Sequence, residues 1–479
     1  MSKTKLFIII ILILSLAAGV ILGLYFYTNK STTELTPVNN TDKNIFGGVG
    51  GVRTDLPKDT TNSTSNQEPE TSKPTSTSTP QVPPLRMIHS SPVSGFTFIT
   101  KDIYSTSSTL IASSSKNVGK KQIIKPKIIG QEEKIRFVER GTGYVYETAS
   151  SSLKNLRISN STQTRMLESL FDLKGENIIF RGLLKNSDII ETKLATLFYQ
   201  DATSTELSLK TKDLEYNMLF PAISPEKDSL VYYTETKGVE SIIKTSKLDG
   251  TGAVIIYKSP FREWLLSWPN KDIIVLNTKP SAYANGFAYT INPKIKSFKR
   301  LVGEKAGLTT LMSPDGLKVL VGESVDGSIK LSVLDTKNNS TKDLFLKVLP
   351  EKCVWSKLEK SVVYCAAGEA ITYAPYPDAW YQGLVFFDDN IWKINVETQE
   401  NKLLVVTKDF VKTGLDIINM NLSKKEDYII FSNKKDLSLW GFEIPKPKTE
   451  AATSTKSVET KNTTNTGAKA TSTKSTKQN

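Results

Sequence analysis

The chain of 479 residues contains a single histidine, His89. Ser-His-Asp and Cys-His nucleophilic sites need an imidazole as general base near neutral pH, and zinc sites built on several histidines need more than one. His89 lies in a short alternating segment, Leu85 to Ser90, which is typical of a β-strand. We therefore predict no catalytic residue and no metal site of these kinds, and the sequence indicates no cofactor.

Carboxylates need separate consideration, because a glycosidase requires only two of them. Asp378 lies in a segment rich in tyrosine and proline, and Asp388 and Asp389 follow the same segment. Adjacent aspartates more often belong to a solvated turn than to an acid–base pair. A carboxylate-dependent glycan hydrolase or lyase is therefore the alternative function, behind a binding role.

Two segments, 279–286 and 373–383, concentrate aromatic side chains and prolines between apolar runs. Tyrosine and tryptophan suit binding, because each offers a large, rigid contact area with a polar group at its end. Prolines reduce the entropy lost when such a segment is held in place. The candidate binding residues are Tyr283, Tyr373, Tyr376, Trp380 and Tyr381.

Cys353 and Cys365 are the only cysteines. Their spacing excludes a CxxC redox site. If two strands pair antiparallel about Glu359, the two cysteines lie opposite each other, within reach of a disulfide. A pair of separate buried thiols is the other interpretation, and both stay open.

A repeat predicts the elements that must position these residues. Six times, a Ser or Asp is followed six to eight residues later by three consecutive apolar residues, and successive anchors lie 43 to 67 residues apart. A period of about 40–50 residues, with turn residues between anchor and triplet, is typical of propeller blades. The anchors are Asp172, Ser224, Ser267, Ser313, Ser356 and Ser423, and their triplets begin at Ile178, Leu230, Ile273, Val319, Val362 and Ile429.

Each repeat has room for four short strands, and residues 94–159 have the pattern of a seventh repeat with an insertion at 101–133. The last repeat supplies only three strands, and Leu85–His89 has the pattern of the missing fourth. The sequence therefore predicts an all-β, seven-bladed β-propeller over residues 85–445, closed by an N-terminal strand. Such closure removes an exposed sheet edge.

In this propeller the two aromatic loops, each between the second and third strands of its repeat, would project from the same face. The five candidate residues would then form one patch that binds a partner. In the other interpretation, the longer loop folds down over the mouth of the central channel. Both interpretations stay open.

The motif Ser-Pro-Asp-Gly at 313–316, followed by its apolar triplet, resembles the repeat of TolB-like and WD-repeat-like propellers of bacterial envelopes. Ser224–Val231 has a similar form, whereas Asp172 replaces the serine in one repeat and the turns after Ser356 and Ser423 lack the proline. The resemblance covers most of 85–445, and the whole layout is similar to membrane-anchored envelope proteins of this type. It implies a fold and a location but no activity.

The flanks of the propeller predict a tethered protein. Leu6–Tyr27 is an uncharged run of 22 residues preceded by Lys3 and Lys5, long enough to cross a bilayer as a signal anchor. A cleaved signal peptide is the other interpretation, although its apolar core is normally only ~7–15 residues long. With residues 1–5 in the cytoplasm, everything after the anchor faces outward. Residues 28–84 and 446–479 are predicted to be a disordered stalk and tail, because they are poor in apolar side chains.

The net charge is +13, but seven lysines and only two glutamates of the tail supply a good part of it. Nucleic-acid binding needs a concentrated basic face, so we expect no nucleic-acid partner. The sequence predicts a membrane-tethered, extracytoplasmic binding or scaffold propeller that recognises a protein, peptide or envelope glycan.

Overall fold

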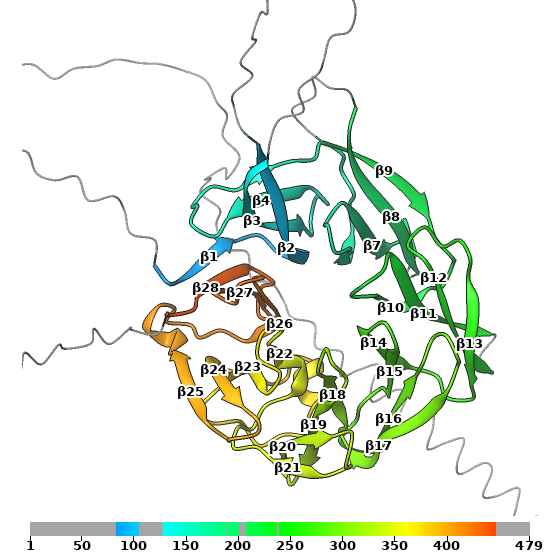
Figure 1. The fold of residues 1–479 in the computed structure, drawn as a ribbon, viewed down its shortest axis with the longest axis vertical. Helices are drawn as coiled ribbons and strands as arrows, with labels where there is room; N and C mark the ends of the chain where they lie inside the picture. The colour runs from blue at the N-terminus through cyan, green and yellow to red at the C-terminus, as the bar shows by residue number, and fades with distance from the viewer. Residues whose placement is uncertain (1–82, 105–127, 188, 201–206, 237–238, 447–479) are drawn as a thin grey trace, which may run out of the picture. The chain divides into compact units, whose positions relative to one another are not determined.

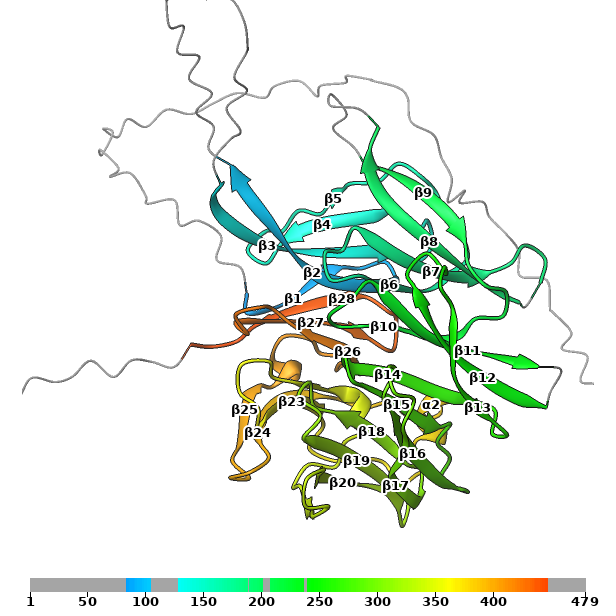
Figure 2. The same ribbon diagram turned by 45° about the vertical axis from the view of Figure 1, so that its right-hand side comes forward.

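The computed structural model describes residues 83–104, 128–187, 189–200, 207–236 and 239–446. Within them, strands β1 to β28 form seven four-stranded antiparallel sheets. The sheets follow one another around a common axis, as Figure 1 shows, and Figure 2 gives a view of their edges. The predicted all-β, seven-bladed propeller is confirmed.

In the first three blades, the order of strands in the sheet is their order in the chain. Blade 1 contains β2 (Val93–Tyr104), β3 (Ile128–Glu139), β4 (Val145–Ala149) and β5 (Leu156–Arg157). Blade 2 contains β6 (Met166–Phe171), β7 (Asn177–Leu183), β8 (Ile190–Tyr199) and β9 (Leu207–Asp213). Blade 3 contains β10 (Leu219–Ile223), β11 (Ser229–Thr236), β12 (Glu240–Lys247) and β13 (Val254–Ser259).

The next three blades repeat this order. Blade 4 contains β14 (Trp264–Asn270), β15 (Ile273–Thr278), β16 (Asn285–Ile291) and β17 (Phe298–Ala306). Blade 5 contains β18 (Thr309–Met312), β19 (Lys318–Val325), β20 (Ser328–Asp335) and β21 (Thr341–Asp343). Blade 6 contains β22 (Cys353–Trp355), β23 (Val362–Ala367), β24 (Asn390–Asn395) and β25 (Asn401–Val405).

Blade 7 is completed by the N-terminal strand. Its sheet runs β26 (Ile417–Leu422), β27 (Tyr428–Asn433), β28 (Leu439–Glu443) and then β1 (Leu85–His89). Leu85 pairs with Phe442 and Arg86 with Gly441 in an antiparallel ladder. The predicted closure by residues 85–89 is confirmed, so the first and last strands of the ring share one sheet.

The physical cause of the repeat is clearest in blade 5. The apolar triplets lie in the second strands, where Val319, Leu320 and Val321 are almost fully buried between neighbouring blades. The anchor stabilises the turn between itself and the triplet. The Ser313 hydroxyl donates to Asp315 Oδ1 (2.7 Å) and accepts from the Lys318 N–H (3.0 Å). In this blade the anchor closes the hairpin that places the triplet in the core, so the two occur together.

The insertion in blade 1 begins later than predicted. Pairing between β2 and β3 continues out to Tyr104 and Ile128. Residues 101–104 and 128–133 therefore belong to the two strands rather than to the insertion, because their backbone groups continue the ladder. Residues 105–127 lie outside the described part of the chain.

The predicted anchor Leu6–Tyr27, most of the stalk (28–84) and nearly all of the tail (446–479) also lie outside the described residues. No helix among the residues that are described has the length and apolar character needed to span a bilayer. Pro84 is described and lies directly before β1, where its carbonyl accepts the N–H of Glu443 in β28 (2.8 Å).

Candidate functional site

A long loop between β23 and β24, residues 368–389, is the most elaborate connection of the described chain, and it contains the short helix α2 (Asp378–Tyr381). Connections in an antiparallel blade alternate between its two ends. This loop therefore lies at the same end of the propeller as the β15–β16 loop, 279–284. The Ala282 N–H donates to Asp378 Oδ2 (2.6 Å), so the two aromatic segments lie side by side.

The five candidate binding residues do not form one patch. Tyr283 and Tyr373 are 80% and 83% exposed and Tyr381 is 38% exposed, but Tyr376 and Trp380 are only 1% and 4% exposed. The last two belong to a buried cluster with side chains of blade 5 and of the loop itself. Both side chains can be buried because the polar group of each donates a hydrogen bond to an acceptor inside the protein. The Tyr376 hydroxyl donates to Thr372 O (2.7 Å) and the Trp380 indole to Asp416 Oδ2 (2.9 Å).

A fully buried charge cluster holds the loop in place. Lys352 ends the 3-10 helix η1 (Pro350–Lys352), and its Nζ lies 2.7 Å from Asp389 Oδ2 and 2.5 Å from Asp416 Oδ1. All three side chains are 0% exposed. Burial raises the pKa of Asp389 to about 6, against the opposing effect of Lys352. The cluster therefore ties the loop, through Asp389, to blade 7 and to the segment that leads into blade 6.

The carboxylates considered for acid–base chemistry have structural partners. Asp378 accepts the Ala282 N–H, and Asp389 is buried against Lys352. Asp388 lies 3.1 Å from both Lys408 and Lys435. Although partial burial opposes ionisation, hydrogen bonds from these lysines hold the pKa of Asp388 below its usual value. None of the three aspartates lines the cavity described next, so they do not act together on a substrate bound in that cavity.

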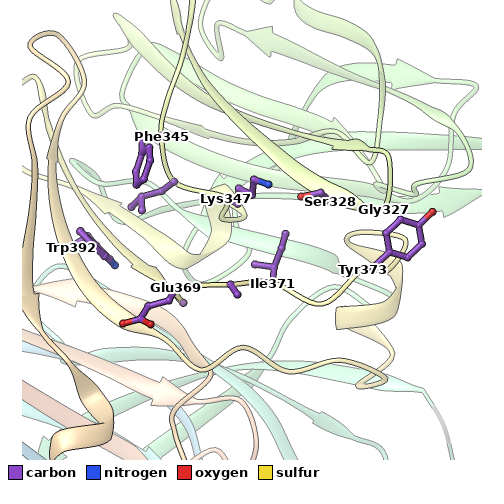
Figure 3. A pocket seen from close by; sticks show the side chains of 11 residues that line it. Gly327, Ser328, Phe345, Lys347, Glu369, Ile371, Tyr373 and Trp392 are labelled. Carbon is purple, nitrogen blue, oxygen red and sulfur yellow. The ribbon is translucent and has the colours of Figure 1, made fainter.

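A cavity of about 610 Å³ opens between blades 5 and 6, beside the start of the long loop. Figure 3 shows Trp392 and Phe345 at one end of it and Tyr373 at the other, with Lys347 and Ser328 between them. Its walls come from the β19–β20 turn, the segment after β21, the loop and β24. The lining residues are Gly327, Ser328, Phe345, Leu346, Lys347, Gly368, Glu369, Ala370, Ile371, Tyr373 and Trp392.

Aromatic side chains of this cavity differ in how firmly they are held. The Trp392 indole donates to Ala367 O (3.2 Å), which fixes its half-buried ring. Tyr373 packs onto Gly327, where a Cβ atom would lie 2.3 Å from the tyrosine ring and φ is +67°, so only glycine fits. Phe345 is 78% exposed. The cavity therefore presents preformed apolar surface, with few polar groups.

The polar groups of the cavity are sparse and of mixed charge. Lys347 and Glu369 supply one cation and one carboxylate. The Ser328 hydroxyl is buried and has no hydrogen-bond partner among the described residues. Among these same residues, no group of three or more His, Cys, Asp or Glu side chains could hold a metal ion.

Sequence reasoning identified Tyr373 but not Phe345 or Trp392. Phe345 lies two residues after the short outer strand β21 and Trp392 lies within β24, so each had the pattern of an ordinary strand residue. Lys352 gave no signal either, since its partners Asp389 and Asp416 are distant in the chain. Only the three-dimensional packing of blades 5, 6 and 7 brings these side chains together.

Cys353 and Cys365 are joined by a disulfide with an S–S distance of 2.06 Å. They are directly paired in register across β22 and β23, as antiparallel pairing about Glu359 predicts. The bond crosses the first two strands of blade 6, just beyond Lys352. It therefore reinforces the blade that carries the long loop.

No protein-family model matches this chain, and no curated protein matches it either. Several solved structures are similar to this chain. TolB from Acinetobacter baumannii is 12% identical, with a TM-score of 0.36 and coverage of 56% of this chain and 58% of TolB. The chain resembles TolB proteins in fold. It thus matches little more than half the length of that TolB.

Two enzymes are among the similar structures. Oligogalacturonate lyase from Vibrio parahaemolyticus is 8% identical, with a TM-score of 0.44 and coverage of 65% of this chain and 87% of the lyase. A puromycin-hydrolyzing peptidase from Mycobacterium tuberculosis is 11% identical, with a TM-score of 0.40 and coverage of 63% and 49%. At these identities the likeness concerns the fold and assigns no activity.

Proposed function

We propose that this chain is a membrane-tethered, extracytoplasmic propeller that binds a partner through the cavity between blades 5 and 6. The observation that carries the proposal is the exposure of Tyr373 and Phe345, 83% and 78%, at the rim of a preformed cavity. Covering such rings is favourable by about 25 cal/mol for each Å² of apolar surface removed from water. The backbone next to Tyr373 is held by the hydrogen bond from the Ala374 N–H to Gly327 O (2.9 Å), so little backbone entropy is lost when a partner binds there.

A protein or peptide segment fits this cavity better than a glycan does. Binding sites for small polar ligands rely on several convergent hydrogen-bonding groups. Here Ser328, Lys347 and Glu369, together with the polar ends of Tyr373 and Trp392, are the polar side-chain groups, and apolar surface makes up the rest of the side-chain lining. An apolar side chain of the partner would enter between Phe345 and Trp392.

The proposal of a membrane tether rests on the sequence on the N-terminal side of the propeller. Leu6–Tyr27 is uncharged and long enough to span a bilayer. Residues 28–84 would let the propeller range over roughly 40 Å from the membrane as a flexible coil. Such a tether suits a scaffold that captures partners near the membrane.

The alternative function, glycan cleavage by paired carboxylates, finds less support in the cavity. Glu369 is the only carboxylate in its lining, whereas hydrolysis by the usual mechanism requires two. The aspartates near the loop are engaged by backbone or lysine groups. We therefore favour binding.

Photo-crosslinking in intact cells tests the proposed function. A photoreactive amino acid replaces Glu369 in the full chain, and we expect a discrete adduct with one partner. Adding Tyr373→Ala and Phe345→Ala should reduce the adduct by about tenfold or more, since aromatic anchors carry most interface energy. Tyr199→Ala, which removes a 59% exposed ring from blade 2, should leave it unchanged.

Two results would count against this function. One is an adduct that persists at full yield without the two rings. The other is turnover of an envelope glycan by the purified chain that is lost with Glu369→Gln, which would favour the hydrolase or lyase.

A further inference from the structure

The end of the propeller that carries the cavity between blades 5 and 6 also carries further exposed apolar side chains. They come from the β15–β16 loop, from the long loop itself and from the β25–β26 connection, residues 406–416. Because connections alternate between the two ends of a blade, these three segments lie at one end. Their exposed fractions range from 38% for Tyr381 to 80% for Tyr283. The five side chains, called here the long-loop surface, are Tyr283, Tyr381, Leu384, Phe386 and Phe410.

Hydrogen bonds join the three segments that carry this surface. The bond from the Ala282 N–H to Asp378 holds the residue next to Tyr283 against the start of α2. The Thr407 hydroxyl donates to Asp389 O (2.5 Å), which ties the start of the β25–β26 connection to the end of the long loop. The long loop therefore has a fixed neighbour on each side.

Two of the rings have contacts that hold them on the loop. The Tyr381 hydroxyl donates to the Glu351 carboxylate. Lys434 Nζ donates to Trp380 O (2.7 Å) and lies 5.3 Å from the centre of the Phe386 ring. Rings that are already held lose little entropy when a partner covers them.

The long-loop surface continues into the cavity. Tyr373 belongs to the same loop, and Phe345 belongs to the connection that also carries Glu351, the acceptor for Tyr381. At roughly 200 Å² for a fully exposed aromatic side chain, the two cavity rings and the five side chains of the surface together offer on the order of 800 Å². One side of a standard interface between two folded proteins buries about 800 Å². The two cavity rings alone offer less than half of that area.

The charges at this end of blades 4 to 7 nearly cancel. Outside the buried cluster, the connections there carry six lysines and seven carboxylates, several of which pair with each other, as Asp388 does with Lys408 and Lys435. An anionic lipid surface or a nucleic acid would need an excess of positive charge. Aromatic side chains without excess charge are typical of the core of a protein–protein interface. The lysines are Lys279, Lys347, Lys408, Lys412, Lys434 and Lys435, and the carboxylates are Asp326, Glu351, Glu369, Asp378, Asp388, Asp409 and Asp436.

The first and last described residues lie at the other end of the propeller. β1 starts there after Pro84 and β28 ends there at Glu443, where the two strands pair. That end also carries a smaller cavity, of about 240 Å³ between blades 3 and 4, with four lysines in its lining. The stalk and the tail therefore join the propeller at the end away from the long-loop surface.

We propose that the partner is a folded protein whose interface covers the long-loop surface as well as the cavity. This inference rests on the proposed function, because it extends the contact made at the cavity. A short peptide held in the cavity would leave the five further side chains in water. A folded partner can place one side chain in the cavity and cover the others with the adjoining part of its own surface, and apolar patches of this size mark such interfaces.

Photo-crosslinking from a second position tests this inference. A photoreactive amino acid at Leu384 of the full chain, in intact cells, should capture the same protein that is captured from Glu369. Mass spectrometry of the two adducts should locate the crosslinks in separate segments of that protein's sequence, because a folded partner presents distant segments side by side. The same photoreactive residue at Leu173, a 58% exposed leucine in the β6–β7 turn at the opposite end, should not capture it.

A double variant tests the energetic contribution of the surface. Leu384→Ala with Phe410→Ala should lower the yield of the Glu369 adduct by about tenfold, since truncation of aromatic and large apolar contacts weakens an interface most. Both side chains are exposed, so the variant should keep the Tm of the parent chain. Leu173→Ala with Tyr199→Ala, the matched pair at the opposite end, should leave the yield unchanged.

The possible results separate this inference from the function on which it rests. An adduct at Glu369 without one at Leu384, or full yield in the Leu384→Ala, Phe410→Ala chain, would overturn the inference and leave the proposed function standing. Crosslinks from both positions to one short continuous segment would mean an extended peptide instead of a folded protein. A lipid adduct at Leu384 would assign the surface to the membrane. If Glu369 gives no adduct, both the proposed function and the inference fail.

Discussion

Lys352 is the side chain on which the long loop most depends. It neutralises Asp389 and Asp416 at 0% exposure, and Trp380 hydrogen-bonds the second of these. Lys352→Ala would leave two buried carboxylates without a cation, which costs on the order of 3–5 kcal/mol. Urea denaturation of the full chain in detergent would measure this as a fall in the free energy of unfolding.

Lys393→Ala serves as the control for that experiment. Lys393 pairs with Glu359 at 31% and 55% exposure, where solvent screening reduces an ion pair to about 0–1 kcal/mol. Similar losses for Lys352→Ala and Lys393→Ala would contradict the central role given to the buried cluster.

The raised pKa of Asp389 predicts how the cluster responds to pH. The folded carboxyl has a pKa of about 6 because burial disfavours its charge, against an ordinary value of 3.8. It therefore binds a proton more tightly when folded, and its favourable contribution is fully present below pH 4 and is lost as pH rises through 6. The change should be on the order of 2–3 kcal/mol.

Asp389→Asn should remove this decline. Unfolding free energies measured at pH 4.5 and 7 should differ less in Asp389→Asn than in the parent chain. Asp249→Asn is the matched control, because hydrogen bonds from Thr251 lower the pKa of Asp249 to about 2, below the range tested. A parent-like slope in Asp389→Asn would show that another group titrates.

Among the elements, the closing strand β1 offers the clearest prediction. The Glu443 N–H donates to Pro84 O, and alternation along the ladder then directs the Arg86 N–H at β28. Arg86→Pro removes that donor and leaves its acceptor on β28 unpaired, which should destabilise the ring by about 1–3 kcal/mol. Thermal unfolding of the full chain should show this loss of stability as a lower Tm.

Arg86→Ala separates backbone from side-chain effects in this strand. It keeps the ladder but loses the guanidinium, which donates to Ser150 O (2.6 Å). We expect Arg86→Pro to be clearly less stable than Arg86→Ala and more open to proteolysis at both ends of the ring. Equal stabilities would mean that the ladder of β1 adds little to closure.

The strands were predictable from the sequence because their signals are local. A Ser or Asp anchor, a turn and an apolar triplet lie within ten residues of each other, as in Ser313–Val321, so six of the seven blades carry a local signal. Closure followed from counting strands in the last repeat. The cysteine pairing depended on one hairpin register, which the sequence places about Glu359.

The path of the long loop was not predictable in the same way. Tyr376 and Trp380 had the composition of a binding surface, yet Trp380 is buried because Asp416 supplies an acceptor 36 residues away in the chain. A loop has no periodicity to reveal which side faces inward. Its exposed rings could only be assigned once the partners from blades 5 and 7 were in place.

For the whole molecule, the two ends of the propeller differ in chemistry. One carries the long loop and an aromatic cavity of about 610 Å³, and the other carries a lysine-lined cavity of about 240 Å³. A ring of rigid blades keeps these sites apart.

The proposed tether makes a prediction about the orientation of the whole molecule. If Leu6–Tyr27 spans the membrane with residues 1–5 in the cytoplasm, the propeller lies outside. Both native cysteines are in a disulfide, so an added cysteine provides a single free thiol. Lys337→Cys, on an exposed connection of blade 5, should react with a small membrane-impermeant maleimide in intact cells. Ser2→Cys should react only after lysis, and the opposite pattern for the two variants would reject this orientation.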